Sequence, residues 1–172
     1  MKILHVGMVA ALAVAIAALA VACGGDDGAT VEEFVNKVYE IDKAHEAIAE
    51  PLRAELGENL EGVAPDQTMP AGTLDVFARI FDEEADFADK VEAVDASKEY
   101  GSQRNEVVAS MRAEVAYGRG VLATFTDETT VGDFVTAFEG DQATVIEERR
   151  SNGCLGLQKL ADDNGIKVDM TC

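Results

Sequence analysis

The chain has 172 residues, with 33 acidic residues against 14 basic ones, and its formal net charge at pH 7 is −19. Its length suits one domain with a single core. So acidic a chain is not expected to bind nucleic acid, whose affinity for proteins comes from neutralising phosphates with Lys and Arg. It should also be repelled by anionic lipid headgroups, so attachment to a membrane has to come from another source.

The first residues have the pattern of a secretory signal peptide. Met1 and Lys2 give a positive start, and an uncharged apolar run extends from Val6 to Ala22. A charged start, an apolar stretch and small residues before a cut are typical of such signals, so residues 1–22 are expected to be removed. The alternative is a permanent transmembrane helix, for which the run has the minimum length.

The end of this run resembles the lipobox of bacterial lipoproteins, in the residues Leu19-Ala20-Val21-Ala22-Cys23. In that family the chain is cut before the cysteine, whose thiol receives a diacylglycerol and whose amino group is usually acylated, often with palmitate. The resemblance therefore implies that Cys23 is the lipidated first residue of the mature protein. Ala20 stands where the family prefers Leu.

A flexible acidic tether is expected over residues 23–29, because Gly24-Gly25-Asp26-Asp27-Gly28 follows the cysteine directly. Two or more acyl chains hold a protein stably on a bilayer, whereas one chain does so only marginally. The resemblance thus implies a protein anchored by lipid on the extracytoplasmic face of the cell membrane.

The remaining cysteines are Cys154 and Cys172. An odd cysteine in an exported protein needs an explanation, and lipidation of Cys23 supplies it. In an oxidising compartment the other two are expected to form a disulfide. The loop that it closes would stabilise the fold by roughly 3 kcal/mol in the chain-entropy model.

A first helix is expected from the capping box of Thr30 and Glu33. Its apolar face has residues three and four positions apart: Phe34, Val38, Ile41, His45, Ile48, Leu52 and Leu56. Pro51 is expected to kink or restart this helix, because proline removes a backbone donor. Residues 57–72 contain several Gly and Pro residues and are predicted to be a loop.

Two further helices are expected, one capped by Thr73 and ending near residue 96, the other spanning about residues 98–125. The buried face of the second helix is predicted to be Phe77, Ile80, Glu84, Phe87, Val91 and Val94, and that of the third Val108, Met111, Val115, Gly118, Leu122 and Phe125. Gly118 and Gly120 lower helix propensity and could permit a close approach of a neighbouring helix.

The last helical region, residues 131–163, begins with a second capping box, Thr130 and Asp133, and reads either as one kinked helix or as two. Asn164-Gly165 is a helix stop. The tail after it is expected to lie extended over the helices, pinned by Cys172. We therefore predict an all-α domain over residues 30–172: an antiparallel four-helix bundle, with room for an extra short helix and a disulfide-pinned extended C-terminal tail.

The C-terminal pattern resembles that of uncharacterised small bacterial lipoproteins, in Cys154, Leu157-Gln158, Ala161, Gly165-Ile166, Val168-Asp169 and Cys172. The likeness covers only this end of the chain. It implies a helical lipoprotein closed by a disulfide and implies no activity.

Catalytic residues are scarce, so we expect no enzyme, no cofactor and no metal site. His45 is the only histidine left after signal removal, and the chain has neither a Gly-x-Ser-x-Gly elbow nor a phosphate-binding Gly-Lys-Ser/Thr loop. Di-iron bundles use Glu-x-x-His on two helices, whereas this chain has Asp42-x-x-His45 once.

One pair of polar residues falls on predicted apolar faces. His45 lies near the middle of the first helix and Glu84 near the middle of the second, at similar depth if the two helices are antiparallel. Gln142 is a third polar candidate. A buried carboxylate beside an imidazole is typical of a structural ion pair, a metal-ligand pair or a proton-linked switch. The alternative is a satisfied polar pair, or one side chain rotated to the surface. The acidic cluster from Asp82 to Asp89 is interpreted as a solvated helix face, or as a loose cation site.

Two functions remain open on these grounds. The first is a non-enzymatic envelope lipoprotein that interacts with another envelope protein. The second is a module that binds a small ligand or a metal in a pocket between the helices, lined by His45 and Glu84. A cavity at the middle of the domain would favour the second, and an exposed apolar groove the first.

Overall fold

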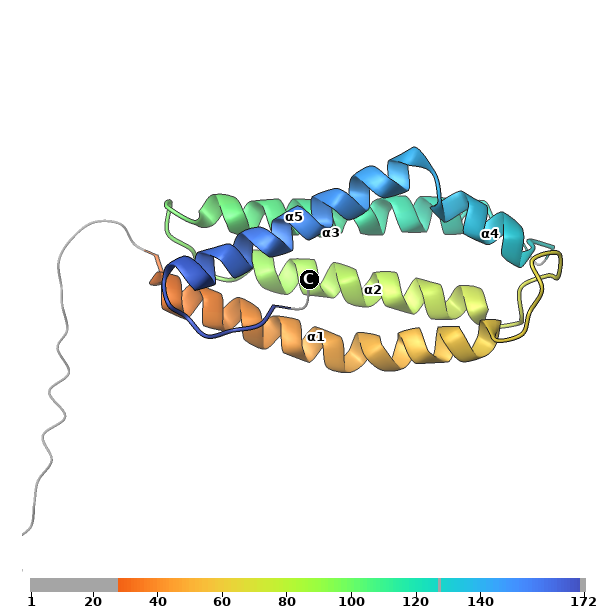
Figure 1. Ribbon diagram of the computed structural model, residues 1–172, viewed down its shortest axis with the longest axis horizontal. Coiled ribbons are helices and arrows are strands. Elements are labelled where there is room, and N and C mark those ends of the chain that lie inside the picture. The colour runs from red at the N-terminus through yellow and green to blue at the C-terminus, as the bar shows by residue number, and fades with distance from the viewer. Residues whose placement is uncertain (1–27, 127, 171–172) are drawn as a thin grey trace, which may run out of the picture.

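The computed structural model describes residues 28–126 and 128–170. Over these residues every regular element is a helix: α1 (Val31–Leu60), α2 (Thr73–Glu92), α3 (Gly101–Leu122), α4 (Val131–Phe138) and α5 (Asp141–Asp163) (Figure 1). The predicted all-α class is therefore confirmed. The last helical region consists of two helices, with Gly140 at the N-cap of α5.

Both predicted capping boxes are present. The Thr30 hydroxyl accepts a hydrogen bond from the Glu33 N–H at 3.2 Å, and the Glu33 carboxylate accepts one from the Thr30 N–H at 2.9 Å. Thr130 and Asp133 form the same reciprocal pair at the start of α4. These bonds satisfy N–H groups that have no partner within the helix, and so they fix where α1 and α4 begin.

The predicted cap of α2 is wrong. Gly72 is the N-cap residue, with φ of 86°, a left-handed conformation that glycine adopts without strain. Thr73 is the first helical residue, and its side chain is fully buried. Thr73 therefore contributes to packing and does not cap the helix.

Helix α1 continues without a break through Pro51 and extends to Leu60, so the helix does not restart there and the loop begins later than predicted. The predicted apolar face is wrong at Ile48, which is 47% exposed, whereas Asp42 and Ala49 are buried. The expected pattern advanced by alternating steps of three and four residues, a period of 3.5. Because the true helical period is 3.6, the buried face drifts away from that pattern over several turns.

Helices α2 and α3 are both shorter than predicted. Val94 and Tyr100 lie outside both helices, yet their side chains are buried. These apolar residues in the connection between α2 and α3 continue the apolar pattern past the last helical turn. Burial of a side chain reports packing, and packing does not require helical backbone.

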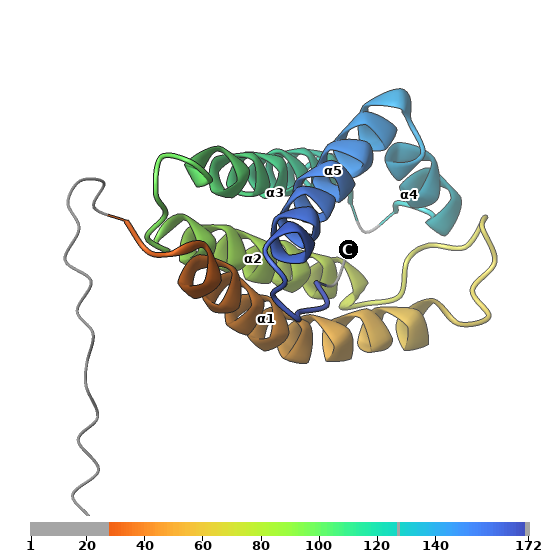
Figure 2. The same cartoon turned by 60° about the vertical axis from the view of Figure 1, so that its left-hand side comes forward.

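The neighbouring helices run in opposite directions (Figure 1). α2 packs between α1 and α3, and α5 packs against both α3 and α1. α5 crosses over the other helices at a visible angle, and α4 lies beside the loop that follows α1 (Figure 2). Backbone hydrogen bonds join this loop to the start of α4, from Met69 N–H to Thr129 C=O and from Val131 N–H to Gln67 C=O, each at 3.0 Å.

The tail after α5 returns along that helix. α5 ends at Asp163, and Gly165 has φ of 69°. The Gln158 side-chain oxygen accepts a hydrogen bond from the Met170 N–H at 3.0 Å, and its amide donates to the Val168 carbonyl at 3.2 Å. Met170 is buried. A side chain of α5 therefore holds the tail against the helices.

The apolar interior consists of two clusters. The larger lies where α1 starts, α2 ends and α5 ends, and includes Phe34, Val38, Val91, Val108 and Leu157. The smaller lies toward the other end and comprises Leu52, Val76 and Ile80. Buried polar residues, among them His45 on α1 and Glu84 on α2, lie between the two clusters, and they belong to the candidate site.

Candidate functional site

A layer of polar side chains crosses the domain between the two apolar clusters. It is made of buried or half-buried residues from four helices: Asp42 and His45 on α1, Glu83 and Glu84 on α2, Ser110 and Glu114 on α3, and Arg150 on α5. Buried charged groups are rare unless they are paired, because removing a charge from water costs free energy. We therefore take this layer as the candidate functional site.

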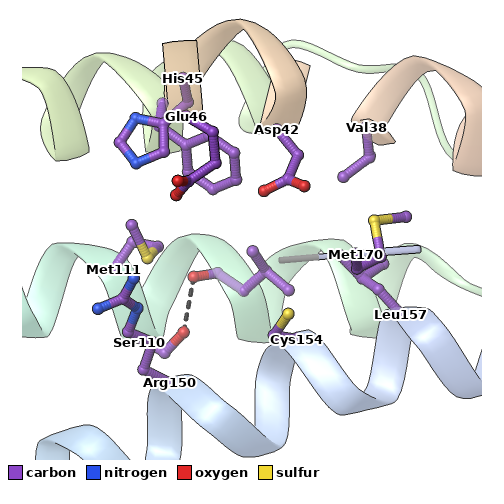
Figure 3. Close-up of a pocket in the computed structure, with 12 residues that line it drawn as sticks. Val38, Asp42, His45, Glu46, Ser110, Met111, Arg150, Cys154, Leu157 and Met170 are labelled. Atoms are coloured by element: carbon purple, nitrogen blue, oxygen red, sulfur yellow. Dashed lines mark hydrogen bonds between the residues drawn. The ribbon is translucent and has the colours of Figure 1, made fainter. Parts of the chain in front are cut away.

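Several residues of the layer line a small cavity of about 40 Å³, which we call the midplane cavity. Figure 3 shows Asp42, His45 and Glu46 of α1 facing Ser110 of α3 and Arg150 of α5 across it. Its volume suits a few water molecules at most. The Ser110 hydroxyl is already engaged, because it donates to the Val107 carbonyl at 2.8 Å.

His45 is 5% exposed and packs against Phe87, with 4.9 Å between the ring centroids. Its Nδ1 lies 3.5 Å from the nearer Glu83 carboxylate oxygen, an ion-pair distance, and neither ring nitrogen has a hydrogen-bond partner. Burial lowers the pKa of His45, and the charges of Glu83 and Glu46 oppose that shift only in part. The imidazole is therefore held neutral at neutral pH.

Glu84 is the second buried titratable residue of the layer that has a shifted pKa. It is 4% exposed, and its Oε2 is buried without a hydrogen-bond partner. Burial and, to a lesser extent, the nearby Glu114 carboxylate raise the pKa of Glu84 to about 7, against the opposing effect of Arg150 and Arg53. Glu84 can therefore gain or lose a proton near neutral pH.

Glu114 and Arg150 form an ion pair between α3 and α5, with 3.2 Å from Arg150 Nη1 to Glu114 Oε1. The second oxygen of Glu114 is buried and has no hydrogen-bond partner. Arg53 makes a three-bond contact with Glu46 at 3.0 to 3.2 Å. Both arginines near Glu84 thus have their own carboxylate partners.

Glu84 lines a second, half-open cavity of about 370 Å³, which we call the aromatic cleft. Its apolar wall is made of Phe77, Ile80, Phe81, Tyr117, Phe138 and Ile146. Phe138 of α4 completes this wall, because α4 is held by ring contacts with α2 and α3 and by a bond of 2.7 Å from the Tyr117 hydroxyl to the Ala137 carbonyl. A cavity of this size with an apolar wall and a few polar groups is typical of small-ligand sites.

The predicted pair, His45 and Glu84, is buried as expected, but the two residues line different cavities. The carboxylate beside His45 is that of Glu83. Gln142 is exposed, so its predicted place beside the pair is wrong. The acidic cluster is largely engaged on the surface, where Asp82 pairs with Arg119 and Asp89 with Arg112.

The predicted covalent sites fall mostly outside the described residues. Cys23 and Cys172 lie there, so lipidation and the disulfide stay predictions. Cys154 is on α5 and lines the midplane cavity together with Met170 of the tail. The tail therefore brings the chain back toward Cys154 two residues before Cys172.

Sequence reasoning missed Glu114 and Arg150. A signal for Arg150 exists, because it precedes Cys154 by four residues and Leu157 by seven, the spacing of one helix face. Glu114 lies three residues after the buried Met111, at the edge of the buried face of α3. A charged residue at the edge of an apolar face usually points to solvent, so the pattern alone does not show that Glu114 belongs to the buried layer.

In the part of the chain that the structure describes, there is no cluster of three or more His, Cys, Asp or Glu side chains suited to hold a metal ion. The same residues include no helix with the length and apolar character needed to cross a membrane. Comparison of the chain with protein-family models, with curated proteins and with solved structures finds no match.

Proposed function

We propose that the chain is an extracytoplasmic lipoprotein, anchored to the cell membrane through lipidated Cys23, whose helical domain is a non-enzymatic binding module. The observation that carries the binding role is the aromatic cleft, which combines an apolar wall with the buried carboxylate of Glu84. Such a combination provides both contact area and a polar group that fixes orientation.

The anchor is supported by the order of features in the sequence. An apolar leader, a lipobox-like end and a Gly- and Asp-rich tether precede residue 30, and α1 begins at Val31. The domain then starts with a complete capping box, so its fold does not need the preceding residues to define the first helix. This arrangement suits a domain held at a short distance from a membrane surface.

We further propose that α1, α2, α3 and α5 form a four-helix bundle, with α4 as the extra short helix and a Cys154–Cys172 disulfide closing the tail. The contacts of α2 with α1 and α3, and of α5 with α3 and α1, support the bundle. The return of the tail to Met170, beside the cavity that Cys154 lines, supports the disulfide.

Of the two binding roles, a small ligand is favoured over an envelope protein. The cleft lies within the domain, between α1, α2, α3 and α5, where a ligand would contact several helices at once. The large exposed apolar side chains Ile48, Val135, Val145 and Leu155 come from three different helices. A protein partner remains the second candidate, and it would bind over such surface residues.

The anchor is tested by replacing Cys23 with Ala in the native host and fractionating the cells. The variant should move from the membrane fraction to the soluble extracytoplasmic fraction, because two or more acyl chains are needed for stable attachment. The matched control is a double variant, Cys154→Ala with Cys172→Ala, which should stay in the membrane fraction. Retention of Cys23→Ala in membranes would show that the leader or a partner, and not lipid on Cys23, holds the chain.

A further inference from the structure

We propose that the aromatic cleft binds a protonated primary amine that carries an apolar or aromatic group, with Glu84 and Glu114 holding the ammonium. This inference rests on the helical domain being a binding module, and it is independent of the lipid anchor. It names the ligand class from the charges, the unpaired oxygens and the wall of the cleft.

The charges of the cleft leave one buried carboxylate uncompensated, that of Glu84, while the carboxylate of Glu147 is exposed to solvent. Five charged residues line it: Arg53 from α1, Glu84 from α2, Glu114 from α3, and Glu147 and Arg150 from α5. Arg150 is paired with Glu114, and Arg53 is paired with Glu46 outside the cleft. No described arginine or lysine forms a salt bridge with Glu84. A positive group of a ligand would complete the set.

The hydrogen-bonding groups favour a primary ammonium over other cations. The Oε2 atoms of Glu84 and Glu114 are both buried and both lack a partner, and such atoms cost free energy until a donor reaches them. An –NH₃⁺ group has three donors, which is enough for both oxygens. A trimethylammonium group has no donor. A calcium ion would require six to eight oxygen ligands, more than these two carboxylates supply.

The wall of the cleft suits the rest of such a molecule. Phe77, Phe81, Tyr117 and Phe138 surround it with rings from three helices. Aromatic faces attract cations as well as apolar groups, which makes a wall of this kind compatible with an amine close by. A volume of about 370 Å³ lies within the range of small-ligand pockets.

The protonation state of Glu84 makes this binding depend on pH. Glu84 has a pKa of about 7, because burial and Glu114 raise it against the opposing effect of Arg150 and Arg53. An alkylammonium keeps its proton up to about pH 10, as lysine does. The ionised fraction of Glu84 therefore rises about tenfold between pH 6 and pH 8, and the affinity for the amine should rise by the same factor.

The test is calorimetric titration of the full chain in nanodiscs, with empty nanodiscs subtracted. Three probes of similar shape are compared: 2-phenylethylamine, its N,N,N-trimethyl derivative and 2-phenylethanol. The amine should bind at least roughly tenfold more tightly than the alcohol, because a charged hydrogen bond is lost with the alcohol. The trimethyl derivative should bind more weakly than the amine.

Two variants with the same chemical change locate the site. Glu84→Gln removes the charge in the cleft and should weaken amine binding at pH 8 at least roughly tenfold, while binding of the alcohol is unchanged. Glu83→Gln is the matched control, since Glu83 is the neighbouring residue but faces His45, and it should leave amine binding unchanged. Loss of the pH dependence in Glu84→Gln completes the assignment.

The possible results separate this inference from the proposed function. If the alcohol binds as tightly as the amine and Glu84→Gln changes neither, the ligand is not a cation, and the binding module stands. If the trimethyl derivative binds best, the hydrogen-bond assignment to Glu84 and Glu114 is overturned. If no probe binds, the inference fails and the cleft no longer supports a binding role, whereas the result for Cys23→Ala is unaffected.

Discussion

Glu83 and Glu84 are adjacent on α2, yet their carboxylates face two different sides of that helix. Glu83 lies 3.5 Å from Nδ1 of His45, while Glu84 lines the aromatic cleft with Glu114. Successive residues of an α-helix point about 100° apart, so one helix can supply both sides. The two carboxylates are therefore a natural pair of positions for testing each side separately.

The first prediction concerns Glu84 and stability. Its pKa is raised from 4.5 unfolded to about 7 folded, so between these values the folded state binds more protons than the unfolded state. Stability must then fall as pH rises through this window, by about 3 kcal/mol in total. Glu84→Gln should remove this loss, and at pH 8 the variant should be more stable than the unaltered protein in urea denaturation.

The comparison has to be made at two pH values. Well below pH 4.5, Glu84 is protonated in both states, so the variant and the unaltered protein should have similar stability. If the two proteins lose stability in parallel between pH 5 and pH 8, Glu84 is not a buried carboxylate with a raised pKa.

The second prediction concerns His45, whose pKa is lowered by burial. Below about pH 6.5 the unfolded state takes up a proton that the folded state resists, so stability should fall as pH falls. His45→Gln should reduce this loss, measured as the change in urea midpoint between pH 7.5 and pH 5. Glu83→Gln should deepen it, because the Glu83 charge raises the pKa of His45. Equal acid sensitivity in all three proteins would argue against a buried neutral imidazole.

The third prediction concerns the contact between α2 and α3. A Cβ on Gly118 would lie 2.0 Å from Cζ of the Phe81 ring, whereas a Cβ on Gly120 would meet nothing within 4 Å. Gly118→Ala should therefore destabilise the protein by about 1 to 3 kcal/mol, because the buried ring has to move. Gly120→Ala is the matched control on the same helix.

Gly120→Ala should stabilise α3 by about 0.5 to 1 kcal/mol, since alanine loses less conformational entropy than glycine in a helix. Thermal unfolding of the two variants beside the unaltered protein checks both signs. Equal effects of the two substitutions would mean that Phe81 does not pack on α3 at Gly118.

The fourth prediction concerns the disulfide. Reduction of the exported protein should lower its free energy of unfolding by about 3 kcal/mol, if Cys154 and Cys172 are crosslinked. Hydrogen exchange should then quicken first at Met170, the tail residue whose N–H donates to the Gln158 side chain. A protein whose stability is unchanged by reductant does not contain the proposed bridge.

The elements of the fold were predictable where a local rule determines them. Thr30 and Thr130 show this for helix starts, because each has a carboxylate three residues later, and Gly165 shows it for a helix end. The close approach at Gly118, suggested by a glycine on an apolar face, is also present. Such features depend on a few neighbouring residues and on backbone conformations that few residue types favour.

The site was predictable only in part, because it depends on rotation and on partners from distant helices. Burial of His45 and Glu84 follows from helical spacing, but spacing alone gives no account of which carboxylate turns toward the imidazole. A small drift in phase replaced Ile48 by Ala49 on the buried face of α1. Glu114 and Arg150 come from helices whose packing the sequence does not specify.

The most direct test of the proposed role is mass spectrometry of the protein isolated from its native membrane. A lipoprotein should begin at Cys23, carry two or three acyl chains on that residue and contain a Cys154–Cys172 crosslink. An unmodified Cys23 in a chain that still begins at Met1 would contradict the account. The leader would then be a membrane helix, and the location of the domain and the pairing of its cysteines would both have to be reassigned.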